Sequence, residues 1–560
     1  MSRRALHKLC SSAGVSYLNG AEQLVQCLEN EDTRYVFGLP GEETIEINQA
    51  LSSSKIQFVT VRHEQAAAFM ASVYGRLTGR PGVCLATLGP GATNLVTGIA
   101  NANVDRAPLV ALTGQVDQRR FHKEFHQFVD IVRMLEPITK WTARITRAST
   151  IPEAVRKSFK LAESEKPGAC HLELPQDVVN EDATGHPLLR SELSYPEPAP
   201  DALKKAAQLI DEARYPIVLA GNGVLRGRAN GALEMFATKL GIPVAETFMA
   251  KGAIPMDNEL SLLTIGLQAR DYVACGFDRA DVVIAVGYDF IEYAPVNWNP
   301  NHDKHIIHVD FSPSETDESY TPNVEVIGNV RSSLTSLAEL AKPKARPSIG
   351  ALRELIISET KANSHDPSFP IKPQRLVHAL RQVMGEDDIM VCDVGAHKLW
   401  VARMFPTNVP NTVIISNGLS SMGFGLPGAL VAKLVYPSRN IFAVCGDGGF
   451  LMSCQELETA KRLGLSIVVV IFRDNSYGAI KWKQMERYGK ASGVDFGNPD
   501  FVTFARSFGA NGFRVETAQD LAPILENAKK SDGPSVVDVP VDYEENLILT
   551  KHLGELICPR

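Results

Sequence analysis

The sequence predicts an α/β protein built from three doubly wound, mostly parallel-sheet domains. Its 560 residues suit about three or four domains of ordinary size. Two proline-rich breaks, at residues 186–200 and 342–373, divide the chain, because proline clusters resist both helix and central strand. In each remaining segment short β-branched runs alternate with longer helical patterns. This alternation is typical of parallel sheets covered by helices on both faces.

The three segments, 18–185, 200–341 and 370–550, repeat this alternation in order along the chain. The first opens with a helical pattern that begins at Ala21, and a second helical pattern covers 66–77. The strand-like runs are 56–61, 83–87, 109–113, 217–220, 282–286, 306–309, 389–392, 441–445 and 467–471. We therefore expect an N-terminal, a central and a C-terminal domain of the same layered architecture.

Composition excludes several classes of protein. Apolar residues make up 44% and charged residues 22% of the chain, as in ordinary globular proteins. No apolar run approaches the ~18–20 residues that span a bilayer, so we expect no membrane contact. The net charge is −7 and the basic residues are dispersed, which argues against nucleic acid as a partner. The nine cysteines show no CxxC spacing and indicate buried thiols in a reducing compartment, not disulfides or metal ligands.

The first twenty residues contain Arg3, Arg4 and Lys8 and no acidic residue. They could form a weak organelle-targeting segment or a frayed basic N-terminus. We expect a cytoplasmic protein, with an organelle as the alternative.

Two acidic loops in the third segment predict a metal site. Gly446-Asp447-Gly448-Gly449 and Asp474-Asn475-Ser476 each follow a strand-like run, and their aspartates lie 27 positions apart (474 − 447). In a β-α-β unit both loops reach the same carboxyl edge of the sheet. Two hard oxygen ligands beside a glycine-rich loop suit Mg²⁺ that holds a diphosphate. The alternative is a plain strand–helix turn with two capping aspartates.

Glu64 marks a second candidate site, in the first segment. It stands where the run at 56–61 meets a helix, a position at which a glutamate commonly interacts with the helix dipole. However, the glycine-rich turns Phe37-Gly38-Leu39-Pro40-Gly41 and Leu88-Gly89-Pro90-Gly91 flank it in the sequence. Three loops therefore converge on one sheet edge around Glu64.

With these motifs the chain resembles the thiamine-diphosphate-dependent 2-oxoacid enzymes of the acetolactate synthase family, in their catabolic, large-subunit-like form. The resemblance covers nearly the whole chain after about residue 18. It implies that Mg²⁺ is held by the side chains of Asp447 and Asp474 and by the carbonyl of Ser476. It also implies that the diphosphate is contacted by Gly395, Ala396, His397, Gly448 and Gly449. His397 could otherwise be an ordinary loop histidine.

The resemblance assigns the chemistry to residues of two domains. Glu64 would hydrogen-bond to the pyrimidine N1′ of thiamine diphosphate. Met422 would keep the cofactor bent, so that the amino group of the cofactor's pyrimidine lies close to the thiazolium C2 and removes its proton. The resulting carbanion would attack a 2-oxoacid and release CO₂. Related decarboxylases have an acidic residue where this chain has Ile480. An apolar side chain offers no proton there and so favours attack on a second carbonyl.

The implied reaction condenses two pyruvates to 2-acetolactate with release of CO₂. Gln127 would face the acceptor, whereas His126 and Lys140 could take part directly or be solvated. The alternatives are another thiamine-diphosphate decarboxylase or aldehyde lyase, or a catalytically silent regulatory paralogue. Active sites of this family lie between subunits, so a homodimer or homotetramer is implied.

Three further points concern FAD, a dinucleotide and the metal. Tyr288-Asp289-Phe290 resembles flavin-free synthases, but Met249-Ala250-Lys251 looks like the biosynthetic type, so FAD is possible though not favoured. Gly221-Asn222-Gly223 resembles a dinucleotide loop but fits G-x-G-x-x-G poorly, and we interpret it as a structural turn. Arg473 stands where many relatives have Asn, and we expect its cation to point away from the metal.

Overall fold

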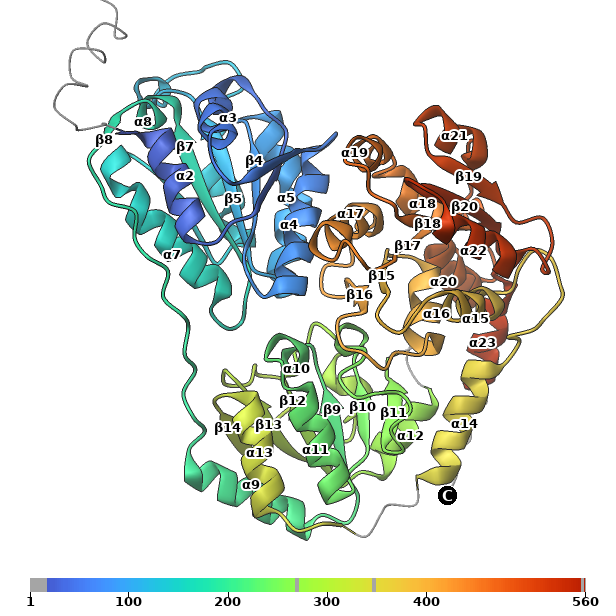
Figure 1. The fold of residues 1–560 in the computed structure, drawn as a ribbon. Coiled ribbons are helices and arrows are strands. Elements are labelled where there is room, and N and C mark those ends of the chain that lie inside the picture. Colours follow the sequence, from blue (N-terminus) through green and yellow to red (C-terminus); the bar gives the residue numbers. More distant parts are fainter. Residues whose placement is uncertain (1–17, 267–270, 345–348, 555–557, 559–560) are drawn as a thin grey trace, which may run out of the picture. The chain divides into compact units, whose positions relative to one another are not determined.

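The computed structural model describes residues 18–266, 271–344, 349–554 and 558. They form two compact units, one that ends at Leu193 and one that begins at Ser194, and each is described by itself (Figure 1). None of the described helices is long and apolar enough to cross a membrane.

The first unit holds a six-stranded parallel sheet in the order β3-β2-β4-β5-β7-β6. Its strands are β2 (Tyr35–Gly38), β3 (Gln57–Thr60), β4 (Gly82–Ala86), β5 (Leu109–Gln115), β6 (Trp141–Arg144) and β7 (Ala169–Pro175). One face packs on α2 (Gly20–Asn30), α3 (Ile45–Ser52) and α7 (Ile151–Glu163). Helices α4 (Glu64–Thr78) and α5 (Pro90–Val104) pack on each other and on the sheet. Gly98 makes this crossing possible, because a Cβ there would lie 2.3 Å from Ala68 Cβ.

The second unit begins with a sheet in the order β11-β10-β9-β12-β13-β14. Its strands are β9 (Pro216–Ala220), β10 (Val244–Glu246), β11 (Ser261–Thr264), β12 (Val282–Val286), β13 (His305–Asp310) and β14 (Val324–Ile327). Alternate residues of β9 face opposite layers. Val218 packs with α9 (Pro200–Glu212), α11 (Asn230–Leu240) and α13 (Val330–Leu340). Ile217 packs with α12 (Tyr272–Arg279), α14 (Gly350–Lys361) and a cluster of buried aromatic rings.

The last sheet has the order β16-β15-β17-β18-β20-β19. Its strands are β15 (Ile389–Cys392), β16 (Val413–Ile415), β17 (Ile441–Gly446), β18 (Val468–Arg473), β19 (Asn511–Arg514) and β20 (Ser535–Pro540). Helices α15 (Pro373–Val383), α16 (Ala396–Met404) and α22 (Leu521–Lys530) pack on one face. Helix α17 (Gly425–Val435) packs on β15 and β17, and α21 (Phe501–Ser507) on β19 and β20.

The predicted fold class is confirmed. Every pairing within the three described six-stranded sheets is parallel. Helical segments separate consecutive strands except β13 and β14. The runs at 282–286 and 389–392 match β12 and β15. The run at 467–471 begins one residue early and ends two residues short of β18, whose last residue is the charged Arg473. The bounds predicted for the three domains, 18–185, 200–341 and 370–550, remain a prediction. The compact units do not divide the chain in that way, because the second unit contains two of the three sheets.

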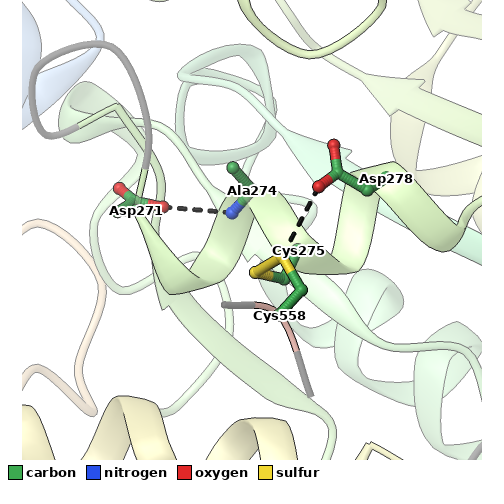
Figure 2. Close-up of a disulfide and its surroundings, with 5 residues drawn as sticks. All are labelled: Asp271, Ala274, Cys275, Asp278 and Cys558. Carbon is green, nitrogen blue, oxygen red and sulfur yellow. Dashed lines mark hydrogen bonds between the residues drawn. A yellow bond between two sulfur atoms is a disulfide. The ribbon is translucent and has the colours of Figure 1, made fainter. Parts of the chain in front are cut away.

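One expectation is wrong. Cys275 on α12 and Cys558 form a disulfide across a sequence separation of 283 residues, so these two cysteines are not free thiols (Figure 2). Asp278 Oδ2 lies 3.5 Å from Cys558 Sγ. Of the other described cysteines, Cys27, Cys84, Cys170, Cys392 and Cys445 are buried thiols and Cys454 is half-buried. Spacing gave no sign of the pair, because its partners are distant in sequence.

Candidate active site

The two acidic loops meet at the carboxyl edge of the last sheet. Strands β17 and β18 are neighbours, with Gly446 opposite Phe472, so Asp447 and Asp474 emerge side by side. The Asp447 carboxylate accepts hydrogen bonds from the backbone N–H groups of Gly448 (2.9 Å), Asp474 (3.2 Å) and Asn475 (2.7 Å). One carboxylate therefore joins both loops.

Asp474 is held by the residues that follow it. Ser476 Oγ donates to Asp474 Oδ2 at 2.6 Å, and Asn475 takes a left-handed conformation with φ of 55° that reverses the chain between them. Burial raises the pKa of Asp474 to about 6, and the neighbouring Asp447 carboxylate adds to the rise. A cation between two crowded carboxylates would relieve this repulsion.

His397 lies at the start of α16, beside the metal loops. Its ring lies 5.7 Å from the ring of Phe472, and a Cβ on Gly395 would lie 2.8 Å from it. Burial lowers the pKa of His397 to about 3, so the imidazole is neutral at pH 7. Its Nε2 is buried and has no hydrogen-bond partner among the described residues. A neutral imidazole carries one N–H, so Nε2 can donate to an anion only in the tautomer that has its proton on Nε2.

Asp393 ties three loops together behind the site. Its buried carboxylate accepts from the backbone N–H groups of Val394 (2.7 Å), Gly423 (3.2 Å) and Phe424 (3.3 Å). A Cβ on Gly449 would lie 2.7 Å from its Oδ2. The sequence analysis did not identify Asp393 as a site residue. It fixes the backbone directly after Met422, whose Cε would lie 3.4 Å from a Cβ on Gly448.

These loops surround a cavity of ≈ 270 Å³ in the second unit. Ten predicted site residues line it together: Gly395, Ala396, His397, Met422, Asp447, Gly448, Gly449, Asp474, Ser476 and Ile480. Ile480, on α20 (Gly478–Tyr488), is 51% exposed. Sequence reasoning missed Ser420, Tyr477 and Tyr543, which also line the cavity. Tyr543 could have been found because it follows β20, which neighbours β18.

The second predicted site is assembled within the first unit. The Glu64 side chain is buried at the first position of α4, and its Oε2 accepts from Asn94 Nδ2 at 2.9 Å. A Cβ on Gly91 would lie 3.4 Å from Glu64 Oε1. A Cβ on Gly89 would lie 2.9 Å from Gln127 Cβ. Glu64, the glycine-rich turn and Gln127 therefore gather at one edge of this sheet, with Gln127 at a left-handed φ of 57°.

His126 and Lys140 differ in position. His126 is exposed on the same loop as Gln127. Lys140 precedes β6, at the amino end of the sheet, and its Nζ donates to the carbonyls of Ser164 (2.6 Å) and Lys166 (2.8 Å). Glu64 lies beyond the carboxyl end of β3, so Lys140 stands at the opposite end of this sheet from Glu64.

Arg473 points away from the acidic loops, as expected. Its Nε donates to Asp538 Oδ1 at 2.7 Å, and the Asp538 carboxylate is 1% exposed. Asp538 also accepts from Arg514 Nε at 3.0 Å. Arg473 is not among the described residues that line the cavity. The cation is therefore neutralised along the sheet and not at the metal loops.

In the central domain, the crevice where an α/β sheet commonly binds nucleotides is filled by Glu292. Its carboxylate accepts from the backbone N–H of Asn222 at 3.0 and 3.1 Å and from the Thr247 hydroxyl. Gly221 and Gly223 are needed for close packing, since a Cβ on either would lie within 2.6 Å of the Gly287 and Tyr288 backbone. The glycine-rich turn is thus structural, and a carboxylate already occupies its N–H donors.

Comparison with known proteins agrees with this geometry. The family models of the thiamine pyrophosphate enzymes match in three parts: the N-terminal TPP binding domain at residues 18–134, the central domain at 203–337 and the C-terminal TPP binding domain at 393–539. The chain is 38% identical to an acetolactate synthase of Bacillus subtilis, over 96% of each chain. It is 36% identical to the catabolic acetolactate synthase of Raoultella terrigena, over 97% of this chain and 98% of the relative. It is 34% identical to a probable acetolactate synthase large subunit of Methanocaldococcus jannaschii, over 96% and 94%.

Proposed function

The chain belongs to the thiamine pyrophosphate enzymes, and on that premise we propose that it condenses two pyruvates to 2-acetolactate. The reaction consumes one proton and releases one CO₂. The observation that carries the proposal is the similarity to proteins named acetolactate synthases over nearly the full length of both chains. The exposed apolar side chain of Ile480 supports it, because no acid stands at that position to protonate a reactive carbon.

The cavity in the second unit fits thiamine diphosphate and Mg²⁺. The glycines at 395, 448 and 449 line this cavity with bare backbone, and the buried Nε2 of His397 lacks a partner among the described residues. Asp447, Asp474 and the Ser476 carbonyl would hold Mg²⁺, since carboxylate and carbonyl oxygens are its preferred protein ligands. When bound, thiamine diphosphate supplies the carbon nucleophile and the electron sink for loss of CO₂.

The chain's own residues would orient the cofactor and the substrate and would hold a proton at the cofactor's pyrimidine. Glu64 would hold a proton against the pyrimidine N1′, with Asn94 fixing one carboxylate oxygen at 2.9 Å. Met422 would pack against the bound cofactor from the wall of the cavity. Gln127 would donate a hydrogen bond to the acceptor pyruvate, and Ile480 would exclude water from the reactive carbon.

We propose that the enzyme works without FAD. Glu292 already occupies the backbone N–H of Asn222 at the central crevice, so this donor is not available to a dinucleotide phosphate. Purified protein should show no flavin absorbance, and added FAD should leave its rate unchanged. Rate stimulation by FAD would refute this part of the proposal.

We also propose a cytoplasmic homodimer or homotetramer in which Glu64 of one subunit serves the cavity of another. Two inactive variants, Glu64→Gln and Asp447→Ala, test the arrangement when they are unfolded and refolded together. A shared site predicts recovery of about a quarter of the wild-type activity, because a mixed dimer keeps one intact site. No recovery from correctly sized mixed dimers would place both residues in one subunit.

The reaction is tested directly by incubating the protein with pyruvate, Mg²⁺ and thiamine diphosphate, and detecting acetolactate. Acetaldehyde as the product would indicate a decarboxylase instead. Failure to bind thiamine diphosphate would indicate a silent paralogue.

A further inference from the structure

Tyr543 presents a buried hydroxyl that the described structure leaves without a partner. The residue lies between β20 and α23 (Glu544–Gly554), and its ring packs partly buried against the last domain's core. Its Oη has no hydrogen-bond partner among the described residues. A buried hydroxyl without a partner destabilises a fold, whereas a phenylalanine ring of the same shape would not. A bound ligand could supply the hydrogen-bond acceptor that this hydroxyl lacks.

The side chain lines the same cavity as the two metal-loop aspartates. A Cβ on Gly478 would lie 2.7 Å from Asp474 Oδ2 and 3.5 Å from Tyr543 Cδ2. The ring thus borders the cavity at the end where Asp474 stands. A tyrosine hydroxyl carries a proton at neutral pH and can donate it in a hydrogen bond.

The neighbouring carboxylates are already satisfied by other donors. Asp447 accepts from three backbone N–H groups and from Asn498 Nδ2 at 2.8 Å. Asp474 Oδ2 accepts from the hydroxyl of Ser476. Neither carboxylate takes the Tyr543 hydroxyl, although both lie along the same cavity.

The backbone on both sides of Tyr543 is fixed. Val541 bridges Ile371 in a parallel pairing, Gln374 Nε2 donates to Glu545 Oε2 at 2.7 Å, and Trp400 Nε1 donates to Asn546 Oδ1 at 2.7 Å. These contacts hold the ring in place before any ligand binds. A preorganised donor loses little entropy on binding and so contributes more to affinity.

We propose that Tyr543 is a cofactor-binding residue whose hydroxyl donates a hydrogen bond to a diphosphate oxygen of thiamine diphosphate, at the metal end of the cavity. The inference rests on the proposed function, since it requires a diphosphate ligand. It places Tyr543 beside the other buried polar atom without a partner among the described cavity residues, His397 Nε2. The two atoms come from distant parts of the chain.

Tyr543→Phe tests this, because the substitution removes only the hydroxyl. The matched control is Tyr488→Phe, the same change at a 63% exposed tyrosine of α20. Calorimetric titration with thiamine diphosphate in excess Mg²⁺ should show a Kd about tenfold higher for Tyr543→Phe, as for one lost hydrogen bond to a charged group. The Kd of Tyr543→Phe for inorganic pyrophosphate, measured with Mg²⁺, should rise by a similar factor. Tyr488→Phe should change neither Kd.

Further measurements locate the contact and check the fold. Mn²⁺ alone should bind Tyr543→Phe with the same Kd as the wild type. If the Kd for Mn²⁺ rose by the same factor as the Kd for thiamine diphosphate, the hydroxyl would lie at the metal and the assignment would be overturned. The ligand-free variant should melt at or above the wild-type temperature, since an unpaired hydroxyl has been removed. A lower melting temperature would mean that the hydroxyl has a partner without the cofactor, which would also overturn it.

The failure of this inference is distinct from the failure of the proposed function. If the wild type binds no thiamine diphosphate, the proposed function is wrong. If the wild type binds it and Tyr543→Phe binds equally well, only the role of Tyr543 is wrong.

Discussion

Arg473 offers the sharpest test of how this chain tolerates a cation beside its metal loops. The structure places the guanidinium on Asp538 and not on the loops, so Arg473→Asn should leave the affinity for Mg²⁺ within about twofold of the wild type. A partly exposed charge that is paired and screened by solvent has only a weak electrostatic effect on a nearby metal site. The guanidinium is 24% exposed.

The stability cost follows from the carboxylate that would remain. Asp538 is 1% exposed but keeps Arg514 Nε at 3.0 Å after the substitution. Removing one of two partners should therefore cost about 1–2 kcal/mol, below the ~3–5 kcal/mol for stripping a buried charge of its only partner. Asp538→Asn should cost more, because it leaves Arg473 without its carboxylate and leaves Arg514 with Asp500 alone. It should also weaken Mg²⁺ binding, since Arg473 is then free to move.

Mg²⁺ affinity is measured by titration in saturating thiamine diphosphate, and stability by urea unfolding of the same variants. Arg514→Asn is the matched control, because it removes the other partner of Asp538 and belongs to β19. Combining Arg473→Asn with Asp538→Asn should restore the Mg²⁺ affinity. If Arg473→Asn alone tightened Mg²⁺ binding tenfold, the guanidinium would be acting on the metal and our reasoning would fail.

Three further predictions concern other parts of the molecule. Burial lowers the pKa of His171 to about 3, below ~6.5 for an unfolded chain; the unfolded state alone takes up this proton as pH falls below 6.5. Wild type should thus lose about 2 kcal/mol more stability than His171→Gln between pH 7 and pH 5, measured by pulse proteolysis in urea. Asn94→Ala should lower the rate of C2–H exchange of the bound cofactor about tenfold, as for a lost hydrogen bond to a charged group. Glu64→Gln should lower this rate further, and hydrogen–deuterium exchange followed by NMR measures both. Cys558→Ser should destabilise the second unit by about 3–5 kcal/mol, measured by urea unfolding without reductant.

Matched variants keep these tests specific. His305→Gln, at an exposed histidine, should keep the wild-type pH profile, and an equal slope in His171→Gln would rule out the buried imidazole as its source. Asn94→Asp should fold but place a second charge beside Glu64, so unchanged exchange in both Asn94 variants would remove Asn94 from any positioning role. Cys454→Ser, at a half-buried free thiol, should leave stability nearly unchanged, and reductant should erase the difference between Cys558→Ser and wild type.

The sequence predicts most of the fold because buried parallel strands have a strong signal. Val282–Val286 and Ile389–Cys392 are apolar on both faces and flanked by turns, so their bounds match the observed strands. The edge strands Trp141–Arg144 and Asn511–Arg514 carry polar residues and glycine, and no comparable run marks them. Strand ends are also uncertain where a charged residue such as Arg473 still pairs within the ladder.

The site could be predicted where function leaves a local motif and not where it depends on tertiary contact. Asp447 and Asp474 follow strands in a recognisable spacing, whereas Asp393 acts through backbone groups thirty residues away, at Gly423 and Phe424. Glu292 lies in the loop that begins at Gly287 and holds no phosphate-binding motif, and only the fold brings it to Asn222. The roles assigned to the cavity residues remain predictions for the experiments above.

The bond between Cys275 and Cys558 joins positions 283 apart in the sequence and closes the chain between them into a covalent ring. That ring contains the whole last sheet and the cavity loops at Asp447 and Asp474. A single proteolytic cut within it would therefore release nothing, since both fragments stay joined through the sulfurs. A nicked protein would run as one species on a non-reducing gel and as two after reduction. The cofactor-binding end of the molecule is thus protected against loss by a single backbone cleavage.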